Sequence, residues 1–518
     1  MFPTDSGLEF EFSMEKEAIP VQEDPPFKIL LLGDYSGREN LVASTDSILP
    51  KAKPIEVDRD NFEDLMKRLN TSLRLGLQDN SDGTLLLNFK ELDDFHPDNI
   101  FKSVSLFSDL RTLRKRLLAP ETFDEAAQEI KAWFEVEDGS ESDEVLEEGD
   151  EDSSSDLDAS SGDLLDDILG QKKADASSYK TPLTGSSLLG DFVRDVVAPY
   201  LVQTDEAEQA KLLELVDSSI GDLMRTILRH PEFRALETAW RGLYFLVRKA
   251  ETNSELKISL LDISKDELKT DLQSASDLTD SDIYKTLVTE TIQTHGGEPW
   301  GLICGNYEFA LDVEDTAALI RMAKLGNIST APFISHIKPQ MLGVDSIAEA
   351  SQERAWKYKD ETQAGKLWTM LRTIPEASSL GLVLPRFLGR LPYGGETDPL
   401  ETFDFEEVTG DIAHEDYVWI NPSFACALLL AQSFSEFGWE MSQSFYLDLV
   451  GLPTHVYPEN GETKTKPCAE VVFTHAACDI LIDQGLMPLI SYKDTDRVRL
   501  GGVHSIAFPA KGLKGRWK

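Results

Sequence analysis

The stretch FKILLLGDYSG, residues 27–37, indicates the fold class of the first part of the chain. Its apolar run, Phe27–Gly33, is short and continuous and stops at polar and glycine residues, a pattern typical of a buried strand that ends in a loop. The stretch IEVDRDNFEDLMKRL follows, with apolar residues at i, i+3, i+4 and i+7 across Phe62–Leu69, which predicts a helix with one apolar face. We therefore expect a mixed α/β fold.

Two domains are predicted. Thr84–Phe89 indicates a second strand and Pro97–Leu118 a helical stretch, so residues 1–130 are expected to form a small α/β domain. Residues 184–518 are expected to form a larger layered α/β domain, because a helical stretch is followed by strands that alternate with helices. The helical stretch is Leu188–Lys249, a core helix is expected over Asn421–Trp439, and the strand candidates are Leu256–Ile263, Trp300–Cys304, Leu380–Leu384, Tyr417–Ile420 and Pro488–Tyr492.

An acidic linker, residues 131–183, separates the two predicted domains. From Glu135 to Asp167 the chain has sixteen Asp or Glu residues and no Lys or Arg. Because such a run repels itself and has few apolar side chains to bury, we expect it to be extended and disordered.

One apolar island interrupts this linker. Leu164, Leu165, Ile168 and Leu169 make one face of a short amphipathic helix over residues 163–171. A helix of about two turns is marginal in water, so it should become ordered only against a groove. That groove belongs either to a partner or to the chain's own second domain.

The charge and cysteine content restrict the partners and the compartment. The formal net charge is -43, which repels both phosphate backbones and anionic membrane surfaces, so we expect protein partners and neither nucleic acid nor membrane insertion. No apolar run approaches the roughly 20 residues that cross a bilayer, and no secretory signal pattern is visible at the start. The cysteines are scattered, and we expect four buried thiols in a cytoplasmic protein: Cys304, Cys426, Cys468 and Cys478.

No motif in the sequence indicates catalysis. LLGDYSGR (Leu31–Arg38) lacks the spacing of a phosphate-binding loop, and GGEPWGLICG (Gly296–Gly305) lacks the dinucleotide-binding pattern. The eight histidines do not form an HExxH pair, and the GxSxG nucleophile motif is absent. We predict a protein that is not an enzyme and needs no cofactor or metal.

A loop rich in arginine, proline and glycine has two open interpretations. LPRFLGRLPYGGETDP (Leu384–Pro399) concentrates Arg386, Arg390 and Tyr393 in a short stretch. Its arginines either satisfy backbone carbonyls inside the chain or contact a neighbouring subunit, and arginine suits both roles.

Ten collinear segments resemble the contractile sheath of type VI secretion systems. PFKILLLGDYSGR, PIEVDRDNFEDLMKRL and LLLNFKELDDFHPDNIF resemble the small sheath subunit, TssB or VipA. Seven further segments resemble the large subunit, TssC or VipB: HPEFRALETAWRGLYFLV, LKISLLDISKDEL, GGEPWGLICGNYEF, APFISHIKPQMLGVDS, LGLVLPRFLGRLPYGGETDP, GLPTHVYP and GLMPLISYKDTD. The chain therefore resembles a fusion of the two subunits, which are normally separate, and the tether would raise the effective concentration of each for the other.

The resemblance implies a mechanical role. Sheath subunits stack helically around an inner tube, dock to a baseplate and contract, and neighbouring protomers exchange β-strands. By this resemblance, Leu8, Phe10 and Phe12 in the alternating stretch Gly7–Met14 are expected to form an exchanged strand. The apolar island matches the segment that the AAA+ unfoldase ClpV recognises, which would make Leu164, Leu165, Ile168 and Leu169 its recognition face.

Two departures from the family lead to an alternative. Asn306 replaces a more usual aspartate, which is a minor change. The chain ends at KGLKGRWK, Lys511–Lys518, where typical large subunits continue into interlocking strands. The alternative is therefore a paralogue that does not polymerise and acts as a cap, baseplate adaptor or scaffold, or that assembles into a ring or with a separate large-subunit chain.

Overall fold

The fold is known from a computed structural model. It describes residues 25–41, 52–76, 84–135, 207–344, 346–349, 354, 356, 361–410, 412–459 and 461–518. The stretch Gly7–Met14 and the island Leu164–Leu169 lie outside the described residues.

Nine strands form the central sheet. They are Phe27–Gly33 (β1), Ile55–Val57 (β2), Leu256–Asp262 (β5), Leu302–Phe309 (β6), Phe333–Ile337 (β7), Leu380–Leu384 (β8), Asp448–Leu449 (β11), Leu486–Ser491 (β14) and Val498–Leu500 (β15). Their order across the sheet is β11-β15-β14-β8-β7-β6-β1-β5-β2. The six strands from β14 to β5 are parallel, whereas β2 pairs antiparallel with β5, β15 with β14, and β11 with β15. The expected mixed α/β class is confirmed.

The strand β1 lies in the interior of a sheet that is otherwise built mostly from the second part of the chain. It pairs with β5 from Phe27↔Leu256 to Gly33↔Asp262, and with β6 from Ile29↔Leu302 to Leu32↔Gly305. Parallel strands covered on both faces are apolar without alternation, which explains the continuous run FKILLLG. The two parts that the sequence separates by a linker therefore share one sheet.

Helices cover both faces of this sheet. Ile29 and Leu31 of β1 pack in one core, and Leu30 and Leu32 pack in the other, because successive side chains of a strand point to opposite faces. The first core contains side chains of Pro231–Lys249 (α9) and Ser423–Phe437 (α14). The second contains side chains of Lys265–Ser274 (α10), Val313–Ser329 (α12), Gln363–Thr373 (α13) and His475–Asp483 (α15).

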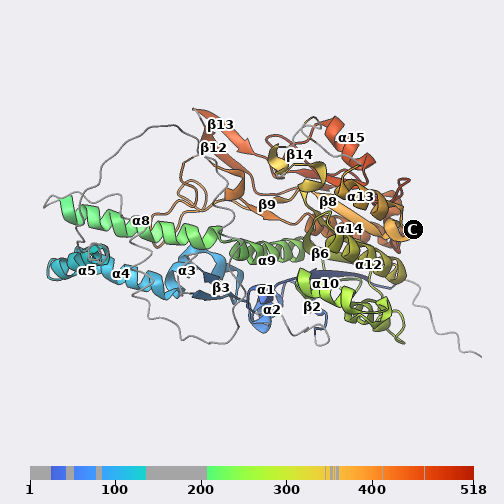
Figure 1. Ribbon diagram of the computed structural model, residues 1–518, viewed down its shortest axis with the longest axis horizontal. Coiled ribbons are helices and arrows are strands. Elements are labelled where there is room, and N and C mark those ends of the chain that lie inside the picture. Colours follow the sequence, from blue (N-terminus) through green and yellow to red (C-terminus); the bar gives the residue numbers. More distant parts are fainter. Residues whose placement is uncertain are drawn as a thin grey trace, which may run out of the picture.

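A helical arm extends from the sheet on the left in Figure 1. In it, Ser105–Leu118 (α4) packs against Phe123–Glu135 (α5) and Ala207–Arg229 (α8). The helix predicted over Pro97–Leu118 is divided into Pro97–Ser103 (α3) and α4, because Val104 has extended backbone angles. The remaining short helices are Arg38–Leu41 (α1), Phe62–Leu69 (α2) and Asp282–Tyr284 (α11).

Three strand pairs lie outside the central sheet. They are Ser72–Gly76 (β3) with Thr84–Asn88 (β4), Phe387–Arg390 (β9) with Val418–Ile420 (β10), and His455–Glu459 (β12) with Glu462–Lys466 (β13). All four cysteines are buried and free, which confirms the prediction for them. Among the described residues, no helix is long and apolar enough to cross a membrane.

Candidate functional site at the junction of the two segments

The first segment, residues 25–135, and the second segment, residues 207–518, meet at the end of β1. Asp262, which ends β5, accepts hydrogen bonds from the backbone N–H of Tyr35 (2.8 Å) and of Ser36 (3.1 Å), and from the Ser36 hydroxyl (2.7 Å). Asp34 holds the same turn from inside by accepting the N–H of Gly37 at 2.8 Å. The GDYSG loop is therefore shaped by a carboxylate from each segment.

Aromatic side chains close the junction behind this loop. The indole N–H of Trp240 on α9 donates to the carbonyl oxygen of Tyr35 at 2.8 Å, and the two rings meet edge to face at 5.7 Å. At the start of β1, Phe27 stacks on Phe434 with ring centroids 5.0 Å apart. Trp439 donates its indole N–H to the carbonyl oxygen of Pro25 at 2.8 Å. Such aromatic pairs contribute about 0.5–1.5 kcal/mol beyond the area they bury.

A second contact joins the helices of the first segment to the loop after β9. Asp98, in the first turn of α3, accepts the backbone N–H groups of Glu401 (3.0 Å) and Thr402 (3.1 Å) and the Thr402 hydroxyl. Burial opposes the charge of this carboxylate, but the hydrogen bonds from Thr402 and Glu401 outweigh it and lower the pKa of Asp98. The rings of Phe101 and Phe403 lie 4.6 Å apart beside it.

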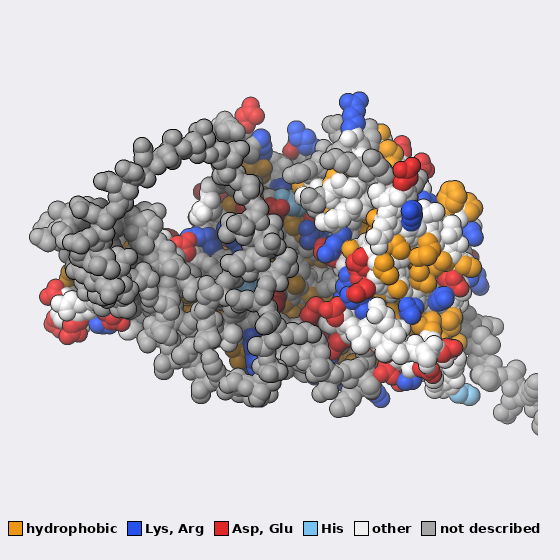
Figure 2. Space-filling model, viewed as in Figure 1, with side chains coloured by type: hydrophobic (Ala, Val, Ile, Leu, Met, Phe, Trp, Pro, Cys, Tyr) orange, Lys and Arg blue, Asp and Glu red, His pale blue; other side chains and the backbone are white. Residues whose placement is uncertain are grey.

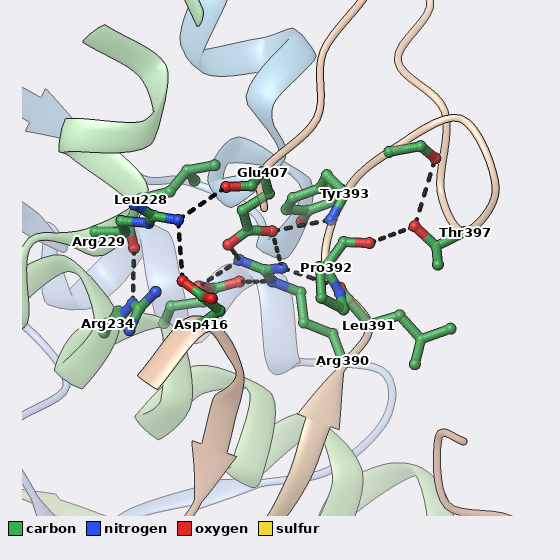
Figure 3. Close-up of polar contacts among 12 residues, drawn as sticks. Leu228, Arg229, Arg234, Arg390, Leu391, Pro392, Tyr393, Thr397, Glu407 and Asp416 are labelled. Carbon is green, nitrogen blue, oxygen red and sulfur yellow. Dashed lines mark hydrogen bonds and ion pairs between the residues drawn. The ribbon is translucent and has the colours of Figure 1, made fainter. Parts of the chain in front are cut away.

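The Arg390 cluster consists of Arg390, Glu237, Glu407, Arg241 and Tyr393. Figure 3 labels Arg390, Tyr393 and Glu407 of this cluster. Arg390 donates to Glu237 of α9 at 2.7 Å and to Glu407 at 2.7 Å, and both carboxylates are fully buried. Its guanidinium lies 4.1 Å from the centroid of the Tyr393 ring. Arg241 also donates to Glu237, at 2.7 Å, and to the Tyr393 hydroxyl, at 2.9 Å.

Neighbouring positive charges keep the buried carboxyl of Glu237 ionised. Burial alone would raise the pKa of Glu237, but the charges of Arg390 and Arg241 outweigh it and lower the pKa to about 2. Burial raises the pKa of Tyr393 to about 12, against the neighbouring arginines. Glu237 therefore stays charged and Tyr393 stays neutral over the ordinary pH range.

Two arginines at the junction of α8 and α9 bind the loop between β9 and β10. Arg229 on α8 donates to Asp416 at 2.9 Å and to the carbonyl oxygen of Glu407 at 3.3 Å (Figure 3). Arg234 on α9 donates to the carbonyl oxygen of Leu228 at 3.1 Å and to that of Glu415 in the loop. The loop between β9 and β10 is thus fixed to both long helices.

A cleft of about 860 Å³ lies at the carboxyl ends of the parallel strands. The first segment contributes Asp34, Glu39 and Asn40 to its lining, and the second segment contributes most of the remaining wall. Arg386 lies in this wall and pairs with Glu470 at 2.8 Å and with Glu308 at 3.2 Å. In open α/β sheets such a crevice is the usual binding position.

The predicted site residues have different surroundings. Arg390 and Tyr393 are buried inside the chain, where Arg390 binds two carboxylates in addition to the carbonyl oxygen of Leu391 at 3.0 Å. Tyr393 also contacts the first segment, because its ring lies 4.8 Å from that of His96. Arg386 faces the cleft, and its role as an inter-subunit residue remains a prediction. The other predicted residues lie outside the described ones: Leu8, Phe10, Phe12, Leu164, Leu165, Ile168 and Leu169.

Sequence reasoning missed Asp262, Trp240 and Asp98. Each acts on a partner more than 200 residues away along the chain, and no local motif marks these contacts. The only local signal is that Asp262 ends a buried strand, LKISLLD, at the edge where functional side chains gather. Within the described part of the chain, no group of three His, Cys, Asp or Glu residues is arranged to hold a metal ion.

Comparison with known proteins gives two family matches and one relative. The family described as EvpB/VC_A0108, tail sheath N-terminal domain, matches residues 210–507, and the family described as Type VI secretion system, VipA, VC_A0107 or Hcp2, matches residues 8–132. The type VI secretion system sheath protein TssC1 of Pseudomonas aeruginosa is 35% identical over 306 residues, which cover 58% of this chain and 61% of that relative. The resemblance found in the sequence is confirmed: the chain belongs to the type VI secretion sheath protein family, with a VipA-like and a VipB-like segment in one polypeptide.

Proposed function

We propose that this chain is a structural subunit of a type VI secretion contractile sheath, which assembles helically around an inner tube and drives the tube outward on contraction. The insertion of β1 between β5 and β6 carries the proposal, because a VipA-like strand completes a VipB-like sheet. Main-chain hydrogen bonds and two shared cores make the segments one body that can transmit load.

The partners of such a subunit are copies of itself, an Hcp-like inner tube, a baseplate and a ClpV-like AAA+ unfoldase. The matched families support self-assembly, since both are described as secretion or sheath proteins. For the strand exchange between copies we propose Leu8, Phe10 and Phe12, and for unfoldase recognition the apolar island. A cytoplasmic site and the absence of catalysis remain part of this proposal.

Negative-stain electron microscopy and sedimentation velocity of the purified full-length chain test this function. Long hollow cylinders that occur in an extended and a shortened form are the expected result. Discrete monomers across the accessible concentration range would contradict sheath formation by this chain alone.

A second candidate is a sheath paralogue that caps, adapts or scaffolds without polymerising. The match covers 61% of the length of the TssC1 relative, so the chain spans less than two thirds of that protein. Adding a separate large-subunit chain to the same sample separates the two readings. Cylinders that form only in the mixture would support the adaptor role.

A further inference from the structure

The last described stretch of the chain runs along the amino ends of the parallel strands. The N–H of Lys514 donates to the carbonyl oxygen of Ser378 just before β8 (2.7 Å), and Arg516 donates to Thr330 just before β7 (2.9 Å). The N–H of Lys518 donates to the carbonyl oxygen of Trp439 at 2.7 Å, beside the start of β1. This edge of the sheet is opposite to the edge that carries the cleft.

Four cations of this stretch form what we call the basic belt: Lys511, Lys514, Arg516 and Lys518. None of them makes an ion pair with a described residue, although the whole chain has a net charge of -43. Figure 2 shows basic and acidic side chains among exposed hydrophobic ones at the end of the molecule that carries α12 and α13. A charged and partly apolar surface of this kind suits a protein partner.

Arg516 supports this interpretation. Its Nε is buried and has no hydrogen-bond partner, and burial lowers the pKa of its guanidinium. A desolvated guanidinium without a carboxylate partner favours an anionic surface.

The cleft at the opposite edge has such a surface. Asp34, Glu39 and Glu232 line its acidic lobe, and Glu39 and Glu232 are exposed at the rim. Burial raises the pKa of Glu39, and the neighbouring carboxylates of Asp266, Asp34 and Glu232 raise it further. Burial also raises the pKa of Asp34, and the charge of Asp262 raises it further, although backbone hydrogen bonds within its own turn lower it.

Two of the positive charges that line the cleft are neutralised by carboxylates. Arg386 is paired with Glu470 and Glu308, and Lys265 is paired with Asp315 at 2.6 Å. Arg234 and Lys338 also contribute to the lining. Negative charge is therefore concentrated at the Asp34, Glu39 and Glu232 side.

We propose that the basic belt of one copy docks in the acidic lobe of the cleft of the next copy. The contact joins two different surfaces at opposite ends of the same strands, and head-to-tail contacts that do not close generate helical assemblies. Copies with a charge of -43 repel each other unless their contact is locally complementary, and this pair of surfaces provides that complementarity. The inference rests on the proposed function, since it names the contact through which the copies stack.

Charge exchange between the two surfaces tests the contact. The belt variant carries Lys511→Glu and Lys514→Glu, and the cleft variant carries Glu39→Lys and Glu232→Lys. Each alone is expected to raise the concentration required for assembly by about tenfold or more, because like charges then face each other. An equal mixture is expected to assemble as the parent does, since each reversed surface then finds a complementary one on the other variant. Sedimentation velocity and electron microscopy measure the assembly, and circular dichroism melting checks the fold.

A matched control carries Lys102→Glu and Lys115→Glu on the helical arm, two exposed lysines with the same change in charge. It is expected to assemble like the parent. The contact is wrong if either variant alone assembles as well as the parent, if the mixture does not restore assembly, or if the control fails equally. Failure of the parent itself would instead overturn the proposed function, and the contact with it.

Discussion

At the scale of single residues, Arg390 shows how a buried charge is held. Its guanidinium lies between Glu237 and Glu407, which have no exposure of their own. Removing one member of a buried ion pair leaves an uncompensated charge in the core and typically costs about 3–5 kcal/mol. Arg390 therefore stabilises the fold mainly by preventing Glu237 and Glu407 from being buried as uncompensated charges.

Arg390→Ala is expected to lower the free energy of unfolding by about 3–5 kcal/mol. Arg390→Lys should recover only part of the loss, because an ammonium cannot bind both carboxylates in the planar fork geometry. Urea unfolding measures both. Arg499→Ala, which removes the exposed pair with Asp448, serves as the control and should cost less than about 1 kcal/mol. Equal effects at both sites would contradict the structural role of the cluster.

Two buried carboxyls, Glu237 of the Arg390 cluster and Glu470 beside Arg386, make stability depend on acid pH. The pKa of Glu237 falls from 4.5 to about 2, because the charges of Arg390 and Arg241 outweigh the effect of burial. The pKa of Glu470 also falls from 4.5 to about 2, because the hydrogen bond from His414 and the charge of Arg386 outweigh the effect of burial. Both carboxyls contribute stability that is present above pH 4.5 and is lost as the pH falls toward 2.

We expect the melting temperature to decrease steadily between pH 5 and pH 2.5, roughly the window set by these two pKa values. Glu237→Gln should be less stable at pH 7 and should show a shallower decrease, since one of the titrating groups is gone. Calorimetry at several pH values checks this. An unchanged slope in Glu237→Gln would show that other carboxyls control the acid transition.

At the scale of elements, the stability of β1 depends on the hydrogen bonds of the loop at its end as much as on its apolar side chains. Asp262 binds two backbone N–H groups and one hydroxyl of the GDYSG loop. Asp262→Ala leaves buried donors unsatisfied, which costs about 1–3 kcal/mol, and should speed hydrogen exchange along β1. Asp109→Ala on α4 is the exposed control and should leave exchange in β1 unchanged. Unaltered protection in Asp262→Ala would place the anchoring of β1 elsewhere.

The apolar island is the element that we propose for unfoldase recognition. Leu165→Asp with Ile168→Asp should abolish capture of a ClpV-like unfoldase in a pull-down, because both changes fall on the proposed binding face. Leu157→Asp, in the same acidic stretch but outside the island, is the matched control. Retained capture by the double variant would move recognition to another segment.

At the scale of the whole molecule, the two segments should stay together without their covalent link. The pairing of β1 with β5 and β6, the shared cores and the Asp98 contact all join them non-covalently. A protease site placed between residues 140 and 160 and then cut should give two fragments that co-elute in size exclusion at neutral pH. Separation of the fragments without denaturant would show that the tether itself holds the chain together.

Local elements could be predicted well from local patterns. The strand Phe27–Gly33, the helix Phe62–Leu69 and the strand Leu380–Leu384 occur with the predicted bounds. The buried strand β7 was missed because FISHI contains Ser335 and His336, whose polar atoms look unsuited to a core. They bond instead to Gly305 and Tyr307 carbonyls and to the Val383 carbonyl, and only the fold provides these partners.

The sequence by itself determined the α/β class, the family and the acidic composition between the two segments, because periodicity, motif order and charge are local properties of the chain. The tertiary structure alone decided that β1 lies between β5 and β6 and that Arg390 is paired inside the chain rather than left free. Both depend on contacts between residues distant in sequence, more than 200 apart for β1. Their energies come from packing and desolvation, which a linear pattern does not specify.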